Sequence, residues 1–490
     1  MKKNIIHLSI LLVALFSFTA ANAQMLERND MIYNSSILPQ ANYYNPAFFQ
    51  PNRDIYITLP SYSISEGLPV AYSDLHFVKN MEKGKTKYKL DLYSLAENLQ
   101  NDKSIHLGTT VNVFGFGFHI NKMFFTFNAS ANVNGSLYFP SGLSDIITGG
   151  LIRSIGKENA SGVVFDKFLS VNAYERFSLG FGYDINKNLT IGIHANLLNG
   201  VASACLDDVN AQVWSEDDAY SQIRGTLQYR FLRAGALNYD FETNEFKEFE
   251  HTFNNLGYTF DLGVVYRLNK FTFSAALVDV GPGIQWKDNV KEITPKNTDL
   301  KFDGNDLGDF MTSGKMDFTF FDGVTDTLDG VLDYVESDYE SYWQAIPAKM
   351  YVGASYTFND YFRVNLLFHG EWDNGIISKG EDGTTFFGEG TRMRHNTSLS
   401  GSLKVNNMIE LMVANAFCFD GEKGSILNPG IGLTLAPANA LQLFIMADYI
   451  SSFKAADIKG THVQFGLNVC FGHDRTKDAA NVVTNDETVL

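Results

Sequence analysis

Apolar and polar residues alternate with a period of two over long stretches of this 490-residue chain. The clearest stretch is 123–139, MFFTFNASANVNGSLYF, whose odd-numbered positions are apolar or glycine and whose even-numbered positions are mostly Thr, Asn and Ser. Successive side chains of a β-strand point to opposite faces, so this stretch has one apolar and one polar face. Strands of soluble sandwiches seldom run so long, whereas a strand between lipid and a hydrated lumen shows this pattern.

The same rhythm recurs along the chain and predicts about 14 strands. Besides 123–139, strands are expected at about 54–65, 107–119, 169–183, 189–197, 258–266, 271–280, 349–358, 362–372, 392–404, 408–418, 430–436, 441–450 and 462–471.

The connections between these strands alternate in length. Tight turns are expected at 120–122, 184–188, 268–269, 359–360, 406–407 and 437–439, and long segments at 140–168, 203–256, 281–348, 372–391 and 451–461. Outer-membrane barrels place short turns in the periplasm and long loops outside, so we expect the long segments to be extracellular. Two of them, 203–256 and 281–348, are long enough to hold an extra hairpin or a short helix.

These patterns predict an all-β protein: a single-domain antiparallel transmembrane β-barrel over residues 53–471, located in the bacterial outer membrane and surrounded by its lipid. Residues 1–23 have the layout of a cleaved secretory signal, with Lys2 and Lys3 before an apolar run and a small-residue ending at Ala23. Residues 24–52 are expected to form a periplasmic or hatch segment. Residues 472–490 are polar and are expected to be a disordered periplasmic tail.

Charge and motif content narrow the function classes. The net charge of −17, about −19 once the signal is removed, disfavours nucleic acid as a partner. No phosphate-binding loop, zinc-protease or serine-hydrolase motif occurs, so we expect no enzyme activity, no cofactor and no metal site. The three cysteines are far apart and are interpreted as packing residues. The dispersed histidines leave a Ser-His-acid grouping of the kind found in barrel lipases open, without positive support.

The polar face of the predicted strands supplies the candidate functional residues. Its charged and histidine members are Arg176, His194, Asp261, Arg363, His369, Glu371, Arg392 and Arg394. Glu371 ends one strand and the two arginines begin the next, so we expect ion pairs between them. Such pairs form a constriction that selects solutes by charge, or they merely fill and rigidify a closed lumen; the sequence leaves both open.

The last predicted strand carries a recognisable pattern. Gln464, Gly466, Val469 and Phe471 occupy the polar, glycine and two hydrophobic positions of a run that resembles the assembly signal of outer-membrane barrels. The resemblance implies recognition by the barrel-assembly machinery. The signal often stands at the very end of a chain, whereas 19 residues follow Phe471 here.

The segment before the first strand contains Asn45-Pro46-Ala47. This run resembles the Asn-Pro-Ala element of long-chain fatty-acid-transporter barrels, in which the N-terminal segment forms a hatch inside 14 strands. Because Asn-Pro is also a common turn, a plain turn is the alternative.

A broader resemblance covers most of the chain, through runs such as FDLGVVYRLNKFTFSAALVDVGPGIQW and NPGIGLTLAP. They resemble a Bacteroidota family of outer-membrane proteins of unknown function, grouped with fatty-acid-transporter and PorV-type barrels. In this resemblance a strand ends in a turn at Asp279 and Gly281, and Pro347 precedes a later strand. Gly281 would permit a sharp exit, and Trp286 would anchor at the membrane interface.

The function that we favour from the sequence is passive transport of a small solute. The rival is a barrel that conducts nothing and serves as a scaffold or secretion partner, as PorV-type proteins do, holding another secreted or outer-membrane protein on its outer loops. A lipid-processing barrel enzyme is the third hypothesis. The polar inner face counts against a lipid substrate, which would want a continuous apolar path.

Overall fold

The computed structural model describes most of the predicted strands and the segment before them. The described residues are 29–49, 53–67, 77–82, 85–90, 103–139, 161–215, 222–236, 239–240, 245–246, 252–296, 298–303, 334–380, 383–387, 393–405, 408–420, 424–437, 440–450 and 460–474. The predicted signal peptide and residues 475–490 lie outside them. Within the described residues no helix has the length and apolarity needed to cross a membrane.

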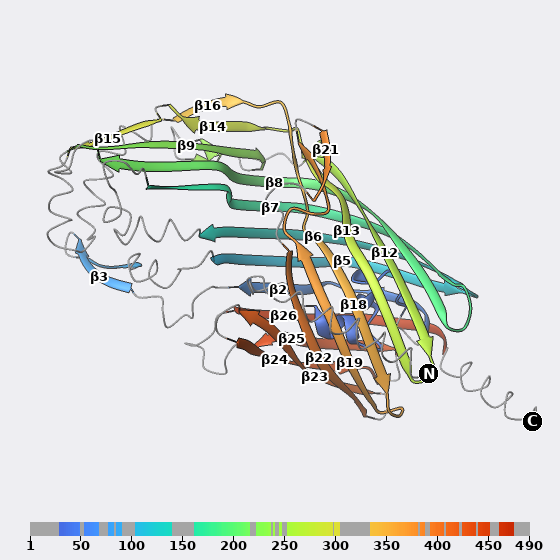
Figure 1. The fold of residues 1–490 in the computed structure, drawn as a ribbon. Coiled ribbons are helices and arrows are strands. Elements are labelled where there is room, and N and C mark those ends of the chain that lie inside the picture. Colours follow the sequence, from blue (N-terminus) through green and yellow to red (C-terminus); the bar gives the residue numbers. More distant parts are fainter. Residues whose placement is uncertain are drawn as a thin grey trace, which may run out of the picture.

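The wall of the barrel consists of long strands joined by tight turns (Figure 1). Their bounds are β1 (Arg53–Thr58), β2 (Ser61–Gly67), β5 (Lys103–Ile120), β6 (Met123–Phe139), β7 (Ser161–Asp184), β8 (Leu189–Ser215), β12 (Leu256–Leu268), β13 (Phe271–Trp286), β17 (Tyr342–Gln344), β18 (Ala348–Thr357), β19 (Phe362–Trp372), β22 (Met393–Val405), β23 (Ile409–Asp420), β24 (Gly424–Leu435), β25 (Leu441–Ile450) and β26 (Gly460–Asp474).

The sheet closes on itself because its first strand pairs on both sides. β1 and β2 form one interrupted strand, and each pairs antiparallel with β26 on one side and with β5 on the other. β17 and β18 likewise both pair with β13 as one interrupted strand. Counted this way, the wall is a closed antiparallel barrel of 14 strands, which confirms the predicted fold class.

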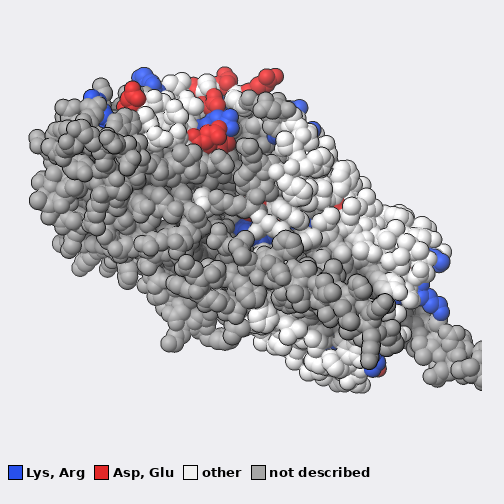
Figure 2. Space-filling model, in the orientation of Figure 1, with Lys and Arg blue, Asp and Glu red and all other residues white. Residues whose placement is uncertain are grey.

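The two faces of the wall differ as the alternation predicts. On β22 the even-numbered residues Arg394 to Ser402 are buried in the interior, whereas Leu399, Leu403 and Val405 are exposed on the outside. In Figure 2 the visible wall is largely free of charged side chains, which gather over β14 to β16 and at the end with short turns. An apolar outer band between two polar ends is what a membrane-spanning barrel presents to lipid, and it places this protein in the bacterial outer membrane.

Beyond the membrane band the wall continues into an outer sheet. The strands outside the barrel are β3 (Phe77–Glu82), β4 (Lys85–Leu90), β9 (Gln222–Gly235), β10 (Tyr239–Asp240), β11 (Glu245–Phe246), β14 (Lys291–Pro295), β15 (Asp299–Asp303), β16 (Tyr334–Asp338), β20 (Ile377–Gly380) and β21 (Gly383–Phe386). The long outer half of β8 pairs with β9, and β9 pairs with β14 and β15. The extra hairpin expected in 203–256 is therefore present, but 203–215 continues β8 and is not a loop.

The expected end of a strand near Val280 is wrong. β13 bulges at Asp279 and Gly283, whose φ angles are +63° and +81°, and then continues to Trp286. Because the strand continues with its even-numbered residues inward, Trp286 is fully buried and donates to Gln344 Oε1 at 3.0 Å, so it is not an interface anchor. Gly281 is needed for close approach, since a Cβ there would lie 2.5 Å from the Tyr258 carbonyl oxygen.

The segment before the barrel lies inside it. It contains α2 (Asp30–Asn34) and the 3-10 helix η1 (Pro39–Tyr43), and nearly all of its residues are buried. Figure 1 shows α2 enclosed by the strands of the wall. We call residues 29–49 the N-terminal segment.

Substitution of the outer face should destabilise the barrel according to depth. Leu399→Arg, in the middle of β22, is expected to lower the free energy of unfolding by about 2–4 kcal/mol, and Val405→Arg, on the same face beside a turn, by about 0–1 kcal/mol. Denaturant unfolding in lipid vesicles measures both. Equal losses from the two variants would contradict this membrane placement.

Candidate functional site: the lumen and its N-terminal segment

The N-terminal segment is held in the lumen by side chains of the wall. Within the described residues it forms no strand pairing, but hydrogen bonds join it to strands on all sides of the barrel. The bonds join Met31 to β25, Tyr33 to β13, Asn34 to β22, Ser35 to β23, Gln40 to β26, Asn42 to β8 and Tyr43 to β1. The Arg363 guanidinium of β19 also donates to the Asn34 carbonyl.

Two buried carboxylates hold the first half of the segment. Asp448 Oδ1 accepts from the backbone N–H of Met31 at 2.7 Å, in the first turn of α2. Glu410 accepts from the hydroxyls of Ser35 and Ser36 at 2.9 and 3.0 Å. These bonds satisfy groups that would otherwise be buried without a partner, which is costly.

The second half of the segment contains the Asn45-Pro46-Ala47 turn. Asn45 Oδ1 accepts from the Ala47 N–H at 3.0 Å, and Asn45 Nδ2 donates to the Tyr33 hydroxyl at 3.2 Å. The wall residues that face this turn are glycines, without side chains. A Cβ on Gly192 would overlap the Pro46 carbonyl, and one on Gly263 would overlap Asn45 Oδ1. The Asn-Pro-Ala run forms a turn that is seated on two wall glycines of β8 and β12, and its role as a hatch element stays a prediction.

A charged cluster lies beside this seat. His194 Nδ1 is 3.0 Å from Asp261 Oδ2, and His194 Nε2 is 3.1 Å from Asn42 Oδ1 of the N-terminal segment. Asp261 Oδ1 accepts from Asn196 Nδ2 and from the Asp279 N–H, at 2.9 and 2.8 Å. Arg176 forms an ion pair with Asp279, so three of the predicted lumen residues, Arg176, His194 and Asp261, come together here.

His369 has a different environment. Its ring stacks on Tyr351 with centroids 4.4 Å apart, and Tyr351 stacks on Tyr33 at 5.1 Å. Phe48 packs edge-on against Tyr33, so wall and segment share one aromatic group. His369 therefore belongs to the packing around the N-terminal segment.

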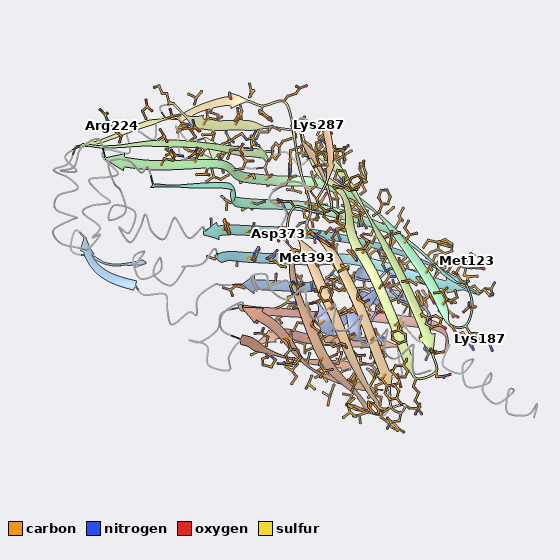
Figure 3. The ribbon with its side chains drawn as sticks, viewed as in Figure 1. Met123, Lys187, Arg224, Lys287, Asp373 and Met393 are labelled. Atoms are coloured by element: carbon orange, nitrogen blue, oxygen red, sulfur yellow. The ribbon has the colours of Figure 1, made fainter. Side chains whose placement is uncertain are left out.

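The outer half of the lumen contains the predicted pair of Glu371 and Arg394. The two side chains meet at 2.5 Å, Asp373 lies 2.7 Å from Arg394 Nε, and Arg394 also reaches His106 Nε2 of β5. Figure 3 shows Asp373 and Met393 close together, at the outer ends of β19 and β22, while Met123 and Lys187 mark the opposite end of the barrel. Arg392 lies outside the described residues.

The Arg394 contact crosses the lumen. Five strands (β23, β24, β25, β26 and the interrupted β1 and β2) separate β22 from β5 around the ring, so the two residues lie on nearly opposite walls. The lumen is therefore bridged by side chains at this level. No feature of the local sequence indicates that His106 would meet Arg394.

A serine-histidine-carboxylate grouping occurs on the inner face. Ser63 Oγ is 2.8 Å from His462 Nε2, and His462 Nδ1 is 3.7 Å from Asp448 Oδ2. The second distance exceeds a hydrogen bond, and Asp448 already accepts from Met31 and Gln464. Within the described residues, no cluster of three or more His, Cys, Asp or Glu side chains is arranged to hold a metal ion.

The four residues of the predicted assembly signal lie on β26, which extends to Asp474, three residues beyond Phe471. Gln464 donates to Asn29 Oδ1 at 2.7 Å, and a Cβ on Gly466 would overlap Ser61. Phe471 is exposed on the outer face, and Val469 pairs with Leu441 and Ile57. Two signal positions thus have packing roles in the folded barrel, and recognition by the assembly machinery stays a prediction.

Several residues that hold the N-terminal segment were not among the predicted site residues. Asp448 and Glu410 lie on the inner faces of predicted strands. A charged residue among polar or apolar inner positions could have marked both of them as candidate site residues. Asn42 carries no comparable signal, because its role depends on a contact with a strand about 150 residues away.

Comparison with known proteins now identifies the family. A model of a family of unknown function (DUF5723) matches residues 46–448. The chain belongs to this family. No curated protein sequence matches significantly.

Several solved structures align with most of this chain at low sequence identity. The chain is similar to the CymD monoaromatic hydrocarbon channel (10% identity, 90% of this chain and 94% of that one, TM-score 0.42) and to the toluene transporter TodX of P. putida (11%, 89% and 94%, 0.40). It is also similar to a FadL homologue of Pseudomonas aeruginosa (12%, 91% and 99%, 0.40).

The glycine seat can be tested by adding one methyl group. Gly192→Ala should displace the Asn-Pro-Ala turn, because its Cβ would overlap Pro46, and should raise hydrogen–deuterium exchange of residues 42–48 roughly tenfold or more. Gly135→Ala is the control, since a Cβ there finds only ordinary contact at 3.8 Å. Unchanged exchange in Gly192→Ala would show that the turn does not rest on this glycine.

Proposed function

We propose that the barrel passes a small solute passively across the outer membrane and that the N-terminal segment acts as its hatch. The observation that carries the proposal is how the lumen is filled. The inner face is lined largely by short polar side chains, such as Ser398, Ser400 and Ser402 on β22 and Ser130 and Asn132 on β6. A ring of 14 strands is wider than the eight-stranded barrels that wall side chains can fill. The chain fills the space with a separate segment instead.

The segment can leave without breaking the wall. The segment is bonded to the strands mostly through its side chains, and a few of its backbone carbonyl and N–H groups bond to side chains of the wall. The strand pairing of the wall is complete around the ring without the segment. Detachment therefore costs local hydrogen bonds and buried apolar contacts but no strand pairing.

The lumen favours a water-soluble solute over a hydrocarbon. Buried apolar side chains facing inward occur mainly where they pack against the N-terminal segment, as Phe444 and Met446 do around Met31, or in the group around Trp286. Elsewhere the path is lined by hydroxyls, amides and charged pairs. A hydrocarbon would have to cross these groups without satisfying them.

Removal of the segment tests the proposal. In planar bilayers, the protein without residues 24–49 should show a conductance roughly tenfold or more above that of the full mature chain, because the inner half of the lumen is then empty. Far-ultraviolet circular dichroism and heat-modified gel mobility check that the barrel remains folded. A folded barrel that is silent in both forms would refute the proposal and favour a non-conducting barrel that binds another protein through its outer loops.

The bridge across the outer half should influence which ions pass. Arg394→Ala in the protein without residues 24–49 removes the cation that faces Glu371 and Asp373, so the reversal potential in a salt gradient should shift toward cation selectivity. Arg230→Ala is the control, because Arg230 pairs with Asp207 in the outer sheet. Equal selectivity in both variants would exclude a selecting role for this bridge.

A further inference from the structure

We infer that His194 is a proton-binding site that latches the N-terminal segment: its ring carries two protons while the segment is seated, and loss of one of them releases the second half of the segment. The inference rests on the proposed function only for its consequence, because release affects transport only if the lumen conducts. The site itself follows from the hydrogen-bond partners of the ring.

Both ring nitrogens of His194 face acceptors. Nδ1 faces Asp261 Oδ2, and Asp261 has the partners of an ionised carboxylate, because its other oxygen accepts two N–H bonds. Nε2 faces Asn42 Oδ1. A neutral imidazole has one N–H and can satisfy only one of these acceptors, whereas the imidazolium satisfies both.

The orientation of the Asn42 amide is determined by its own contacts. Its Nδ2 donates to the carbonyl oxygens of Phe48 and Pro46, at 2.9 and 3.3 Å. Turning the amide over would place Oδ1 against two carbonyl oxygens and leave all three without a donor. Asn42 therefore presents an acceptor to His194.

Charge balance leads to the same assignment. The charged group that faces His194 is Asp261 of β12, and Asp279 of β13 and Arg176 of β7 lie on the far side of Asp261. The neighbours from the other elements are neutral: Asn42 of η1, and Thr126 of β6 beside Gly180. Arg176 compensates one of the two carboxylates. With both carboxylates ionised, a protonated His194 compensates the other, and the buried cluster is then neutral.

Two other histidines of the lumen lack this arrangement. His106 Nε2 faces the Arg394 guanidinium, which can only donate, so that nitrogen must accept. His462 Nε2 faces the Ser63 hydroxyl, which can donate or accept, so a neutral ring is satisfied there. His194 has a carboxylate oxygen 3.0 Å from one ring nitrogen and an amide oxygen 3.1 Å from the other, and it contacts the half of the segment that contains the Asn-Pro-Ala turn.

Deprotonation would remove a bond that spans the interface. With one proton left, the ring keeps its bond to the ionised Asp261 and loses the one to Asn42, because the bond to the charged acceptor is the stronger. Asn42 also holds the Pro46 and Phe48 carbonyls, so the loss loosens the turn seated on Gly192. A lost charge-assisted bond corresponds to roughly a tenfold increase in opening.

The test measures the protons and the release separately, on the full mature chain in nanodiscs. Nitrogen-15 NMR of labelled histidine in mildly acidic buffer should include a signal of a ring protonated on both nitrogens that is absent from His194→Gln. Hydrogen–deuterium exchange of residues 42–48, corrected for the intrinsic effect of pH, should rise about tenfold between roughly pH 5 and pH 8.5. In His194→Gln it should be high at both pH values.

Matched variants separate this site from its rivals. His462→Gln and His395→Gln, the latter with a ring stacked on Phe368, should keep the wild-type pH response. If His194→Gln does not fold, Asn42→Ala removes the acceptor from the segment and should flatten the response while the wall stays unchanged. A singly protonated His194, or a response that survives in both His194→Gln and Asn42→Ala, would overturn the inference. A silent barrel whose exchange follows pH would refute the conduit and leave the proton site standing.

Discussion

A strand inside a bilayer has no water to satisfy its backbone, so every N–H and C=O group of the wall needs a partner on a neighbouring strand. The pairing of β1 and β2 with both β5 and β26 completes this requirement, because it joins the first strand to the last. Closing a ring of 14 strands leaves an interior that wall side chains do not fill. The rest of the structure depends on how that interior is occupied.

The occupant explains why the inner face is polar. The N-terminal segment has short helices and turns whose polar groups are buried without strand partners, so the wall must supply them. Gln40 and Asn468 exchange two amide hydrogen bonds, at 2.6 and 3.0 Å, and Gln442 donates to the Ile37 carbonyl at 2.9 Å. The polar inner face therefore does not only contact water in a lumen, because its amides and carboxylates form hydrogen bonds with particular groups of the N-terminal segment.

The alternation of residues predicted the membrane part of the fold closely and the outer part poorly, for a physical reason. β6 and β25 have the bounds expected from sequence, because lipid on one side and polar contacts on the other impose a period of two. β9 and β14 to β16 lie above the membrane and meet water, so no such period marks them. Trp286 was misplaced because a bulge at Asp279 resembles a strand end when only residue types are considered.

The candidate site was predicted in its residues but not in its contacts. Position on the inner face identified Arg176, His194, Asp261, Glu371 and Arg394, and pairing of adjacent strands brought Glu371 to Arg394. Contacts across the lumen, such as Arg394 with His106 and His194 with Asn42, join residues far apart in sequence and depend on the cross-section of the closed barrel. Residue periodicity along one strand carries no information about that cross-section.

The two halves of the N-terminal segment are held by groups of opposite character. In the first half, Asp448 and Glu410 accept from Met31, Ser35 and Ser36. In the second half, the wall contributes a donor, His194, whose bond is lost when the ring gives a proton up. The two carboxylates of the first half lie on β25 and β23, whereas His194 lies on β8, so the two halves of the segment depend on different parts of the wall. A change at His194 therefore acts first on the half that contains the Asn-Pro-Ala turn.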